Sequence, residues 1–509
     1  MKKQDLENID AVLKEWDRTD TPGCALGIIQ DGELVHARGC GQANLEHGIP
    51  IMAGTRFYIA SVSKQFTAAC ILLLAQRGNL SLQDDIREYL PEIPAYPDPV
   101  RIEHLIYHTS GLREHGVLSR MAGLCMPAYR LSDAVALLAR QRDVNYPAGA
   151  MYLYNNAGYV LQAEIVQRVS GQPFSQFIQE NIFEPLHMDA TFVLEDCSQV
   201  ITGSADSYAP DPSGGYRRYH MTNNVPGSAG VMTTVCDLFQ WDQNFYKSRI
   251  GGETFASLME AKGRLKNGQE IPYGIGLMHG RIQGMSAIYH GGVEFGYRAL
   301  VARFPEKRFS VICLSNLANF SPYRVVEEVV KIFFPGSTPP ATHVSRSGKR
   351  LPGADLLEEG CLGLYCDTNS GAYVILSLQE GQISAEILSS RLPLEIDASE
   401  RAGGVRRLSL SCRNTLFPMS VQIRLEKTQQ HGWQMQAAVE GCPFPLLIQS
   451  RAEAYDESRL AEYSGVYYSP ELQSAYELNL HAGRLCASHA SGPKGNLEPG
   501  PRDFFTLHG

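Results

Sequence analysis

Residues 56–75 read Arg56-Phe-Tyr-Ile-Ala-Ser61-Val-Ser-Lys64-Gln-Phe-Thr-Ala-Ala-Cys-Ile-Leu-Leu-Leu-Ala75, and no other stretch says more about the fold. The part after Lys64 is rich in Ala, Leu and Ile and lacks Gly and Pro, which predicts a buried helix. Ser61 then lies at the start of this helix, with Lys64 one turn further along the same face. Because a helix N-terminus favours negative charge, the stretch indicates a serine nucleophile with an amine beside it.

A second Ser-x-x-Lys spacing, from Ser491 to Lys494, shows what a chance match looks like. Gly492 and Pro493 lie between its ends and no apolar helix follows, which predicts a polar loop. The candidate nucleophile is therefore Ser61.

Two later segments offer partners for this serine. A turn-rich loop carries Tyr154 and Asn156, a phenol and an amide two residues apart, and leads into an apolar helical run. Further on, residues 286–290 are typical of a strand, which is predicted to end at Gly291 and Gly292, where a ligand backbone could approach closely. Taken singly, Tyr154 and His290 are each better explained as packed structural residues. Their order along the chain, after Ser61 and Lys64, favours a shared site.

These motifs resemble those of the serine β-lactamase and penicillin-binding-protein superfamily, in its class C-like branch. The matching positions are Ser61 and Lys64, Tyr154 and Asn156, and His290-Gly291-Gly292, where many members carry Lys-Thr-Gly. Three accessory segments match as well: His108-Thr-Ser-Gly-Leu112, Gly227-Ser-Ala-Gly230 with Asp237-Leu238, and Tyr273-Gly274-Ile-Gly276. The resemblance covers residues 10–335, and the architecture resembles that of bacterial D-aminopeptidases.

The resemblance implies a serine hydrolase that works through an acyl-enzyme. Ser61 would attack a carbonyl, Lys64 and Tyr154 would share the proton transfers, and Asn156 would hold the substrate or the lysine. Which of Lys64 and Tyr154 is the base stays open. Backbone N–H groups of Ser61 and Val293 would form the oxyanion hole.

The third motif bears on specificity. His290 is at most partly charged at neutral pH and Gly291 has no hydroxyl, so we expect weak recognition of a substrate carboxylate. This argues against a D-alanine carboxypeptidase or an efficient β-lactamase and favours an aminopeptidase, amidase or esterase. The resemblance to D-aminopeptidases then implies an aminopeptidase or amidase for D-amino-acid-containing peptides or amides. The alternatives are an esterase, a weak β-lactamase or D-Ala-D-Ala carboxypeptidase-like enzyme, and a catalytically idle, ligand-sensing relative. Gly292 and Val293 would line the substrate site, and Glu294 would pair with a substrate amine unless it is a solvated loop carboxylate.

The composition of the chain indicates which kinds of binding partner to expect. The chain has 509 residues and a formal net charge of −9 with no basic block, which argues against nucleic acid. The first ten residues lack an apolar segment and no apolar run is long enough to span a bilayer, so we expect a cytoplasmic protein without a membrane partner. The twelve cysteines show no C-x-x-C pair, which predicts reduced thiols, no metal site and no cofactor. The expected partner is a small peptide, amide or ester substrate; a homodimer is compatible with the sequence.

The predicted fold is α+β, an antiparallel sheet with packed helices and a helical lobe, followed by two small antiparallel β-barrel-like domains. The predicted helices cover 5–16, 63–78, 131–140, 158–170 and 323–334, and the predicted strands 24–29, 34–37, 299–303 and 309–315. The predicted domains are a catalytic domain (1–335), a linker (336–355) and two β domains (356–452 and 453–509). The β domains share an internal repeat, in which Leu362-Gly-Leu-Tyr365 recurs as Ser464-Gly-Val-Tyr467, and the second copy is predicted to be incomplete.

Overall fold

The computed structural model describes almost all of residues 3–336 and much of 360–508. The described ranges are 3–124, 129–222, 225–336, 360–366, 373–379, 382–387, 390–402, 405–413, 420–428, 432–439, 442–443, 446–449, 457–489, 494–499 and 505–508. The predicted linker and Ser491 of the second Ser-x-x-Lys lie outside these ranges.

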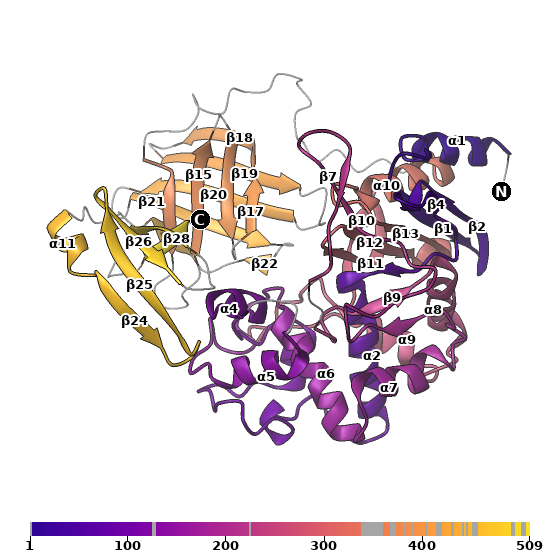
Figure 1. Cartoon of the computed structure of the whole chain (residues 1–509), viewed down its shortest axis with the longest axis horizontal. Coiled ribbons are helices and arrows are strands. Elements are labelled where there is room, and N and C mark those ends of the chain that lie inside the picture. The colour runs from indigo at the N-terminus through magenta and orange to yellow at the C-terminus, as the bar shows by residue number, and fades with distance from the viewer. Residues whose placement is uncertain are drawn as a thin grey trace.

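A six-stranded antiparallel sheet organises the N-terminal two thirds, in the order β10-β11-β12-β13-β1-β2 (Figure 1). Its strands are β1 (Cys24–Gln30), β2 (Glu33–Cys40), β10 (Met278–Ile282), β11 (Met285–Glu294), β12 (Tyr297–Phe304) and β13 (Phe309–Ser315). The predicted hairpin between β1 and β2 is present, with positive φ at both Asp31 (54°) and Gly32 (86°).

Helices cover both faces of this sheet. On β13, Phe309 packs against Phe333 of α10 (Pro322–Phe333), whereas the next residue, Ser310, donates a hydrogen bond to Asp242 of α8 (Val235–Lys247). α8 also packs closely on β1, because a Cβ on Gly27 would lie 2.4 Å from a Val235 methyl. α1 (Lys3–Leu13) lies beside α10 (Figure 1).

A helical lobe is inserted between β2 and β10. Its helices are α2 (Lys64–Gln76), α3 (Ile102–Ile106), α4 (His115–Met121), α5 (Leu131–Ala139), α6 (Asn156–Ser170) and α7 (Phe174–Ile178), with α9 (Phe255–Glu260) following α8. Three short pairings complete the region: β3 (Gln42–Asn44) with β4 (Ile49–Pro50), β5 (Phe57–Tyr58) and β6 (Phe192–Val193) on either side of β9 (Val231–Thr233), and β7 (Tyr208–Pro210) with β8 (Tyr216–Arg218). The predicted α+β architecture with its helical lobe is confirmed.

One strand differs from its prediction. β11 does not end at the glycines but continues through Gly291 and Gly292 to Glu294, paired with β12 throughout. Glycine in a strand interior usually weakens the strand. Here Gly291 and Gly292 are each paired with a residue of β12, so the strand continues through them.

The C-terminal strands form two further antiparallel sheets (Figure 1). The first contains β14 (Gly363–Cys366), β15 (Tyr373–Gln379), β16 (Gln382–Ile387), β17 (Ser390–Pro393), β18 (Glu395–Ala402), β19 (Val405–Arg413), β20 (Ser420–Thr428), β21 (Gly432–Val439), β22 (Cys442–Pro443) and β23 (Leu447–Gln449). The second contains β24 (Gly465–Ser469), β25 (Ser474–His481), β26 (Arg484–Ser488), β27 (Gly495–Pro499) and β28 (Phe505–His508), preceded by α11 (Glu457–Ala461).

The prediction that these sheets close into small barrels is wrong. The first runs from β17 to β18 and the second from β24 to β28, with no pairing between the end strands in the part of the chain that the structure describes. The internal repeat is visible in the pairing, since Gly363 opposes Leu376 in one copy and Gly465 opposes Leu478 in the other. A repeated hairpin specifies local register but not closure, which needs the first and last strands to meet. The domain boundaries and the incompleteness of the second copy stay predictions.

Both C-terminal sheets contact the helical lobe. Tyr146, Met151 and Leu153, from the loop before Tyr154, are buried in one apolar cluster with residues of the first sheet. At the turn between β24 and β25, the backbone carbonyl of Glu471 accepts from Arg140 Nε at 3.2 Å, and its carboxylate pairs with Arg113. The C-terminal region therefore borders the segment that carries Tyr154.

Candidate active site

Ser61 lies in a 3₁₀ turn, Ala60–Ser63, directly before α2, and its relative exposure is 9%. The residue before it, Ala60, has a φ of +46°, a left-handed conformation that costs energy in a residue with a side chain. β11 lies against this turn: a Cβ on Gly292 would stand 2.1 Å from the Ile59 carbonyl oxygen. Gly292 therefore allows the close approach of β11 that holds the serine in place.

Lys64 is fully buried and reaches three oxygen atoms. Its Nζ donates to Ser61 Oγ at 3.1 Å, to Asn156 Oδ1 at 2.8 Å and to the Ser228 carbonyl at 2.7 Å. The predicted meeting of Ser61, Lys64 and Asn156 is thus present in the structure, and Ser228 comes from the predicted Gly227–Gly230 segment.

The start of α6 sets the position of Tyr154 and Asn156. Asn155 caps the helix, its Oδ1 accepting from Gly158 N at 3.2 Å, so Asn156 begins the first turn and faces Lys64. The Tyr154 ring lies 5.0 Å from Lys64 Nζ. The Tyr154 hydroxyl is buried and has no hydrogen-bond partner among the described residues.

The two candidate bases differ in charge state. Burial lowers the pKa of Lys64 to about 7, against the opposing pull of the Glu114 and Glu294 carboxylates. Burial raises the pKa of Tyr154 far above its usual value, and the nearby Ser61 hydroxyl offsets only part of this effect. At neutral pH a large fraction of Lys64 is therefore an unprotonated amine, whereas Tyr154 keeps its proton.

His290 is fully buried within an aromatic cluster. Its Nδ1 lies 2.7 Å from the Gly291 carbonyl and must donate to it, so its Nε2 accepts from the Tyr273 hydroxyl at 3.0 Å. Burial and the charge of Lys64 lower the pKa of His290 to about 3. The imidazole is neutral with both nitrogen atoms engaged, and the carbonyl of Gly291 is one of its partners.

Val293 and Glu294 form the end of β11. Val293 opposes Arg298 in β12, and Glu294 lies on the other face, where its Oε2 accepts from the buried Tyr58 hydroxyl at 3.0 Å. Burial raises the pKa of Glu294, while Tyr58 and Lys64 act in the opposite direction. Glu294 is thus a half-buried strand residue that interacts electrostatically with Lys64, not a solvated loop carboxylate.

Comparison with known protein families shows the family of the chain. The family described as Beta-lactamase matches residues 9–331. The chain belongs to the beta-lactamase family.

Relatives in this family include D-aminopeptidases and penicillin-binding proteins. The D-aminopeptidase of Gluconobacter oxydans is 27% identical over 298 residues, which are 58% of this chain and 56% of the relative, so the match spans about half of that protein. Penicillin-binding protein 4* of Bacillus subtilis is 26% identical over 417 residues, 76% of this chain and 88% of the relative.

Among solved structures, the octameric penicillin-binding protein homologue from Pyrococcus abyssi superposes with a TM-score of 0.58 at 21% identity, over 87% of this chain and 99% of that chain. The D-amino acid amidase from Ochrobactrum anthropi SV3 gives a TM-score of 0.55 at 20% identity, over 64% of this chain and 98% of that one. At these identities the likeness shows the beta-lactamase fold alone.

Sequence reasoning missed Glu114. Its Oε2 accepts from the backbone N–H of Asn156 at 2.7 Å, and its charge raises the pKa of Lys64. The signal was available, because Glu114 comes two residues after the His108–Leu112 segment that resembles the beta-lactamase family. The site therefore contains two carboxylates, Glu114 and Glu294, near one amine.

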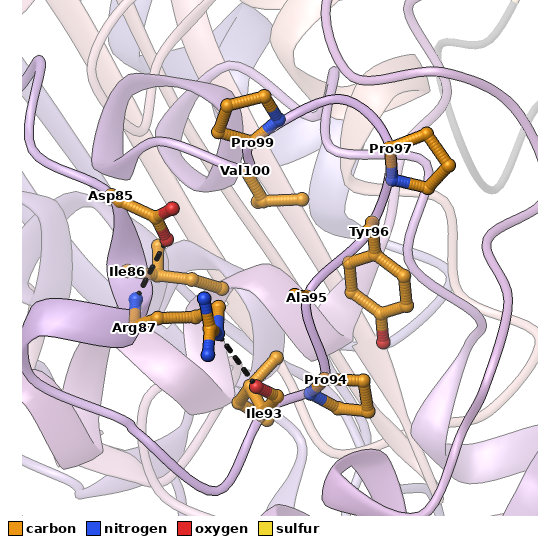
Figure 2. A pocket seen from close by; sticks show the side chains of 10 residues that line it. All are labelled: Asp85, Ile86, Arg87, Ile93, Pro94, Ala95, Tyr96, Pro97, Pro99 and Val100. Carbon is orange, nitrogen blue, oxygen red and sulfur yellow. Dashed lines mark hydrogen bonds between the residues drawn. The ribbon is translucent and has the colours of Figure 1, made fainter.

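Two further pockets are not lined by Ser61, Lys64, Tyr154 or Asn156. One, of about 230 Å³, lies in segment 85–100 of the helical lobe, where Arg87 Nε donates to the Ile93 carbonyl at 3.1 Å (Figure 2). The other, of about 440 Å³, is lined by Met232, Tyr297 and residues of 194–221. Tyr297 packs against Tyr58, and the Tyr58 hydroxyl donates to Glu294. The second pocket therefore lies next to the residue that holds the Glu294 carboxylate.

Metal and membrane features are absent from the described part of the chain. It contains no group of three or more His, Cys, Asp or Glu side chains placed to hold a metal ion. None of its helices has the length and apolar character needed to cross a bilayer. The cysteines whose side chains the structure describes are free thiols.

Proposed function

We propose that the chain is a serine hydrolase that forms an acyl-enzyme and acts on amide bonds of substrates with a free amine, in particular D-amino-acid amides or peptides. One observation carries this proposal: a fully buried amine with a pKa of about 7 lies 3.1 Å from the hydroxyl of Ser61. A serine hydroxyl becomes a nucleophile when a neighbouring base takes its proton, and Lys64 is available in its basic form near neutral pH.

In the proposed reaction, Ser61 Oγ attacks the amide carbon while its proton moves to Lys64 Nζ. The developing oxyanion is held by the backbone N–H groups of Ser61 and Val293. Tyr154, which keeps its proton, passes a proton to the departing amine as the carbon–nitrogen bond breaks, and Lys64 restores it. Water then attacks the ester on Ser61 with Lys64 again as the base, which releases the acid.

The charges of the site support a substrate amine over a substrate carboxylate. His290 is neutral and fully buried, so it offers no positive charge to a carboxylate. Glu114 and Glu294 place two carboxylates near the reacting serine. An ammonium group on the substrate, beside Glu294, would compensate that charge. The preference for D-residues rests on the D-aminopeptidases among the relatives.

The first test is covalent labelling with a fluorophosphonate, followed by peptide mass spectrometry. The adduct should lie on the peptide that contains Ser61, and Ser61→Ala should abolish both labelling and turnover while the unfolding midpoint is retained. An unlabelled wild-type protein would point to an idle, ligand-sensing relative.

The second test defines the substrate. D- and L-aminoacyl p-nitroanilides, their N-acetylated forms and p-nitrophenyl esters are compared by kcat/KM. We expect the free-amine D-series to be preferred. Hydrolysis of the esters alone would make the protein an esterase, and a preference for N-acetylated forms would remove Glu294 from substrate recognition.

A further inference from the structure

His108 takes no part in the proposed proton transfers, yet its conformation is unusual. It is 1% exposed, and its φ of +56° lies in the left-handed region, which is uncommon for residues other than Gly, although His adopts it more often than most. Its Nε2 is buried with no hydrogen-bond partner among the described residues. Such strain persists only where surrounding contacts impose it, and strained residues cluster at functional sites.

Among its contacts, His108 touches three consecutive residues of the loop that leads into α6, namely Leu153, Tyr154 and Asn155. Its backbone carbonyl accepts from Leu153 N at 2.9 Å. Its ring lies 4.3 Å from the Tyr154 ring, centroid to centroid, at an angle of 33°. Its Nδ1 is 3.0 Å from both the backbone N and the carbonyl O of Asn155. His108 therefore contacts Tyr154 and the residues on both sides of it.

These contacts matter because the Tyr154 hydroxyl has no hydrogen-bond partner of good geometry among the described residues, and only the nearby Ser61 hydroxyl acts on it. The direction of the phenol therefore depends on ring packing, in which Lys64 and His290 also take part, and on the flanking backbone. His108 contributes to both. A misplacement of about 1 Å at a reacting group can lower a rate about a hundredfold.

The competing explanation is that His108 only fills space among Tyr152, Tyr159 and Tyr273, whose rings it also contacts. A phenyl ring would fill that space without leaving a nitrogen unpaired, which is costly in a buried site. What the imidazole adds is the Nδ1 contact with the backbone of Asn155, the residue that follows Tyr154 and caps α6.

We propose that His108 is a positioning residue that aligns the Tyr154 hydroxyl for proton transfer to the leaving group. The proposal rests on the proposed function, because it assigns His108 a role through Tyr154. If the proposal is right, the loss of kcat in a His108 variant depends on how much the leaving group needs a proton. Amide cleavage needs that proton, whereas p-nitrophenolate departs without it.

The test uses the full chain with D-alaninamide and the p-nitrophenyl ester of D-alanine. His108→Gly removes the ring and relieves the positive φ, so the backbone is not strained. We expect kcat for the amide to fall about thirtyfold to a hundredfold, kcat for the ester to fall less than about fivefold, and KM for either to change less than about threefold. Tyr154→Phe should give the same pattern.

A double variant separates positioning from stability. If His108 acts through Tyr154, the double variant His108→Gly/Tyr154→Phe should be no slower on the amide than Tyr154→Phe alone. If the two losses multiply, the proposal is overturned. His104→Ala is the matched control, since His104 is another partly buried histidine of the lobe whose Nδ1 accepts from the backbone N of Arg101, and it does not pack on Tyr154. It should lower the unfolding midpoint without changing the amide-to-ester ratio.

The outcomes distinguish the two proposals. Absence of fluorophosphonate labelling at Ser61 in the wild type would remove the proposed function itself. Normal labelling with an unchanged amide-to-ester ratio in His108→Gly would overturn the role of His108 alone. Should His108→Gly not fold, His108→Phe keeps the ring but loses the Nδ1 contact; an unchanged ratio in that variant would equally refute the proposal.

Discussion

The pH dependence of the proposed hydrolase should report the ionisation of Lys64. The amine must be unprotonated to accept the Ser61 proton, and burial places its pKa at about 7. The unprotonated fraction is then about one tenth at pH 6 and about nine tenths at pH 8, so kcat/KM should rise about tenfold between these values. Because the protonated form is inactive, activity is lost as pH falls through 7.

The assay is kcat/KM for p-nitrophenyl acetate between pH 4 and pH 10, since this probe has no ionisable group of its own. Lys64→Arg provides the variant, because a guanidinium has no neutral form in this range and activity should fall by several orders of magnitude. An acid limb near pH 4 to 5 would assign the base to a carboxylate, and a limb above pH 9 would assign it to Tyr154. Either result, or an active Lys64→Arg, would refute the reasoning.

The same pKa affects folding. The pKa of Lys64 is lower in the folded chain than its ordinary value of 10.5, so between these values the unfolded chain binds more protons and stability rises with pH. Integration from pH 6 to pH 9 gives about 3 kcal/mol in favour of the wild type. Relative to Lys64→Met, which lacks this group, the wild type should gain that amount in chemical denaturation; a constant difference would show that Lys64 is not shifted.

Three further predictions concern other parts of the site. Tyr154→Phe should lower kcat on amides by about a hundredfold or more with little change in KM, and an unaltered kcat would return Tyr154 to a packing role. Glu294→Gln, which is nearly isosteric, should raise KM for a free-amine substrate at least about tenfold relative to its N-acetyl form; a parallel change in both would argue against an ion pair. Removal of residues 337–509 should expose Met151 and Leu153, costing about 1.5–3 kcal/mol for each side chain, and should lower the unfolding midpoint and kcat together; full activity in the shortened chain would contradict this.

The catalytic cluster of Ser61, Lys64 and Asn156 could be predicted from the sequence because residues close together in the chain fix each of its positions. Ser61 and Lys64 are one helical turn apart, and Asn156 follows a residue whose side chain caps α6, so both positions are fixed by short-range geometry. The order of the motifs then indicated that the segments meet. Strands β1, β2, β11, β12 and β13 of the sheet were predicted for the same reason, from clear hairpin and burial patterns, whereas β10 was not predicted.

Features that depend on burial were not predictable in the same way. The sequence indicated only that His290 is at most partly charged, because its charge is set by enclosure among Tyr273, Lys64 and the strand backbone, which no spacing encodes. Gly292 was assigned to substrate contact, whereas the structure adds a packing constraint against Ile59. The prediction of closed C-terminal barrels was wrong for a related reason. Hairpin repeats determine which strands are neighbours, whereas closure depends on where the first and last strands lie.

The electrostatics of the site connect substrate recognition with activation of the base. With Lys64 unprotonated, the carboxylates Glu114 and Glu294 have no positive partner in the catalytic cluster, and with Lys64 protonated they partly stabilise its charge. A substrate ammonium beside Glu294 would take over that role and would repel a protonated Lys64, which lowers the pKa of the lysine further. Binding of a cationic substrate and deprotonation of the base then favour each other. A substrate carboxylate would have the opposite effect, since it would stabilise the protonated, inactive lysine, and the neutral His290 could not offset this.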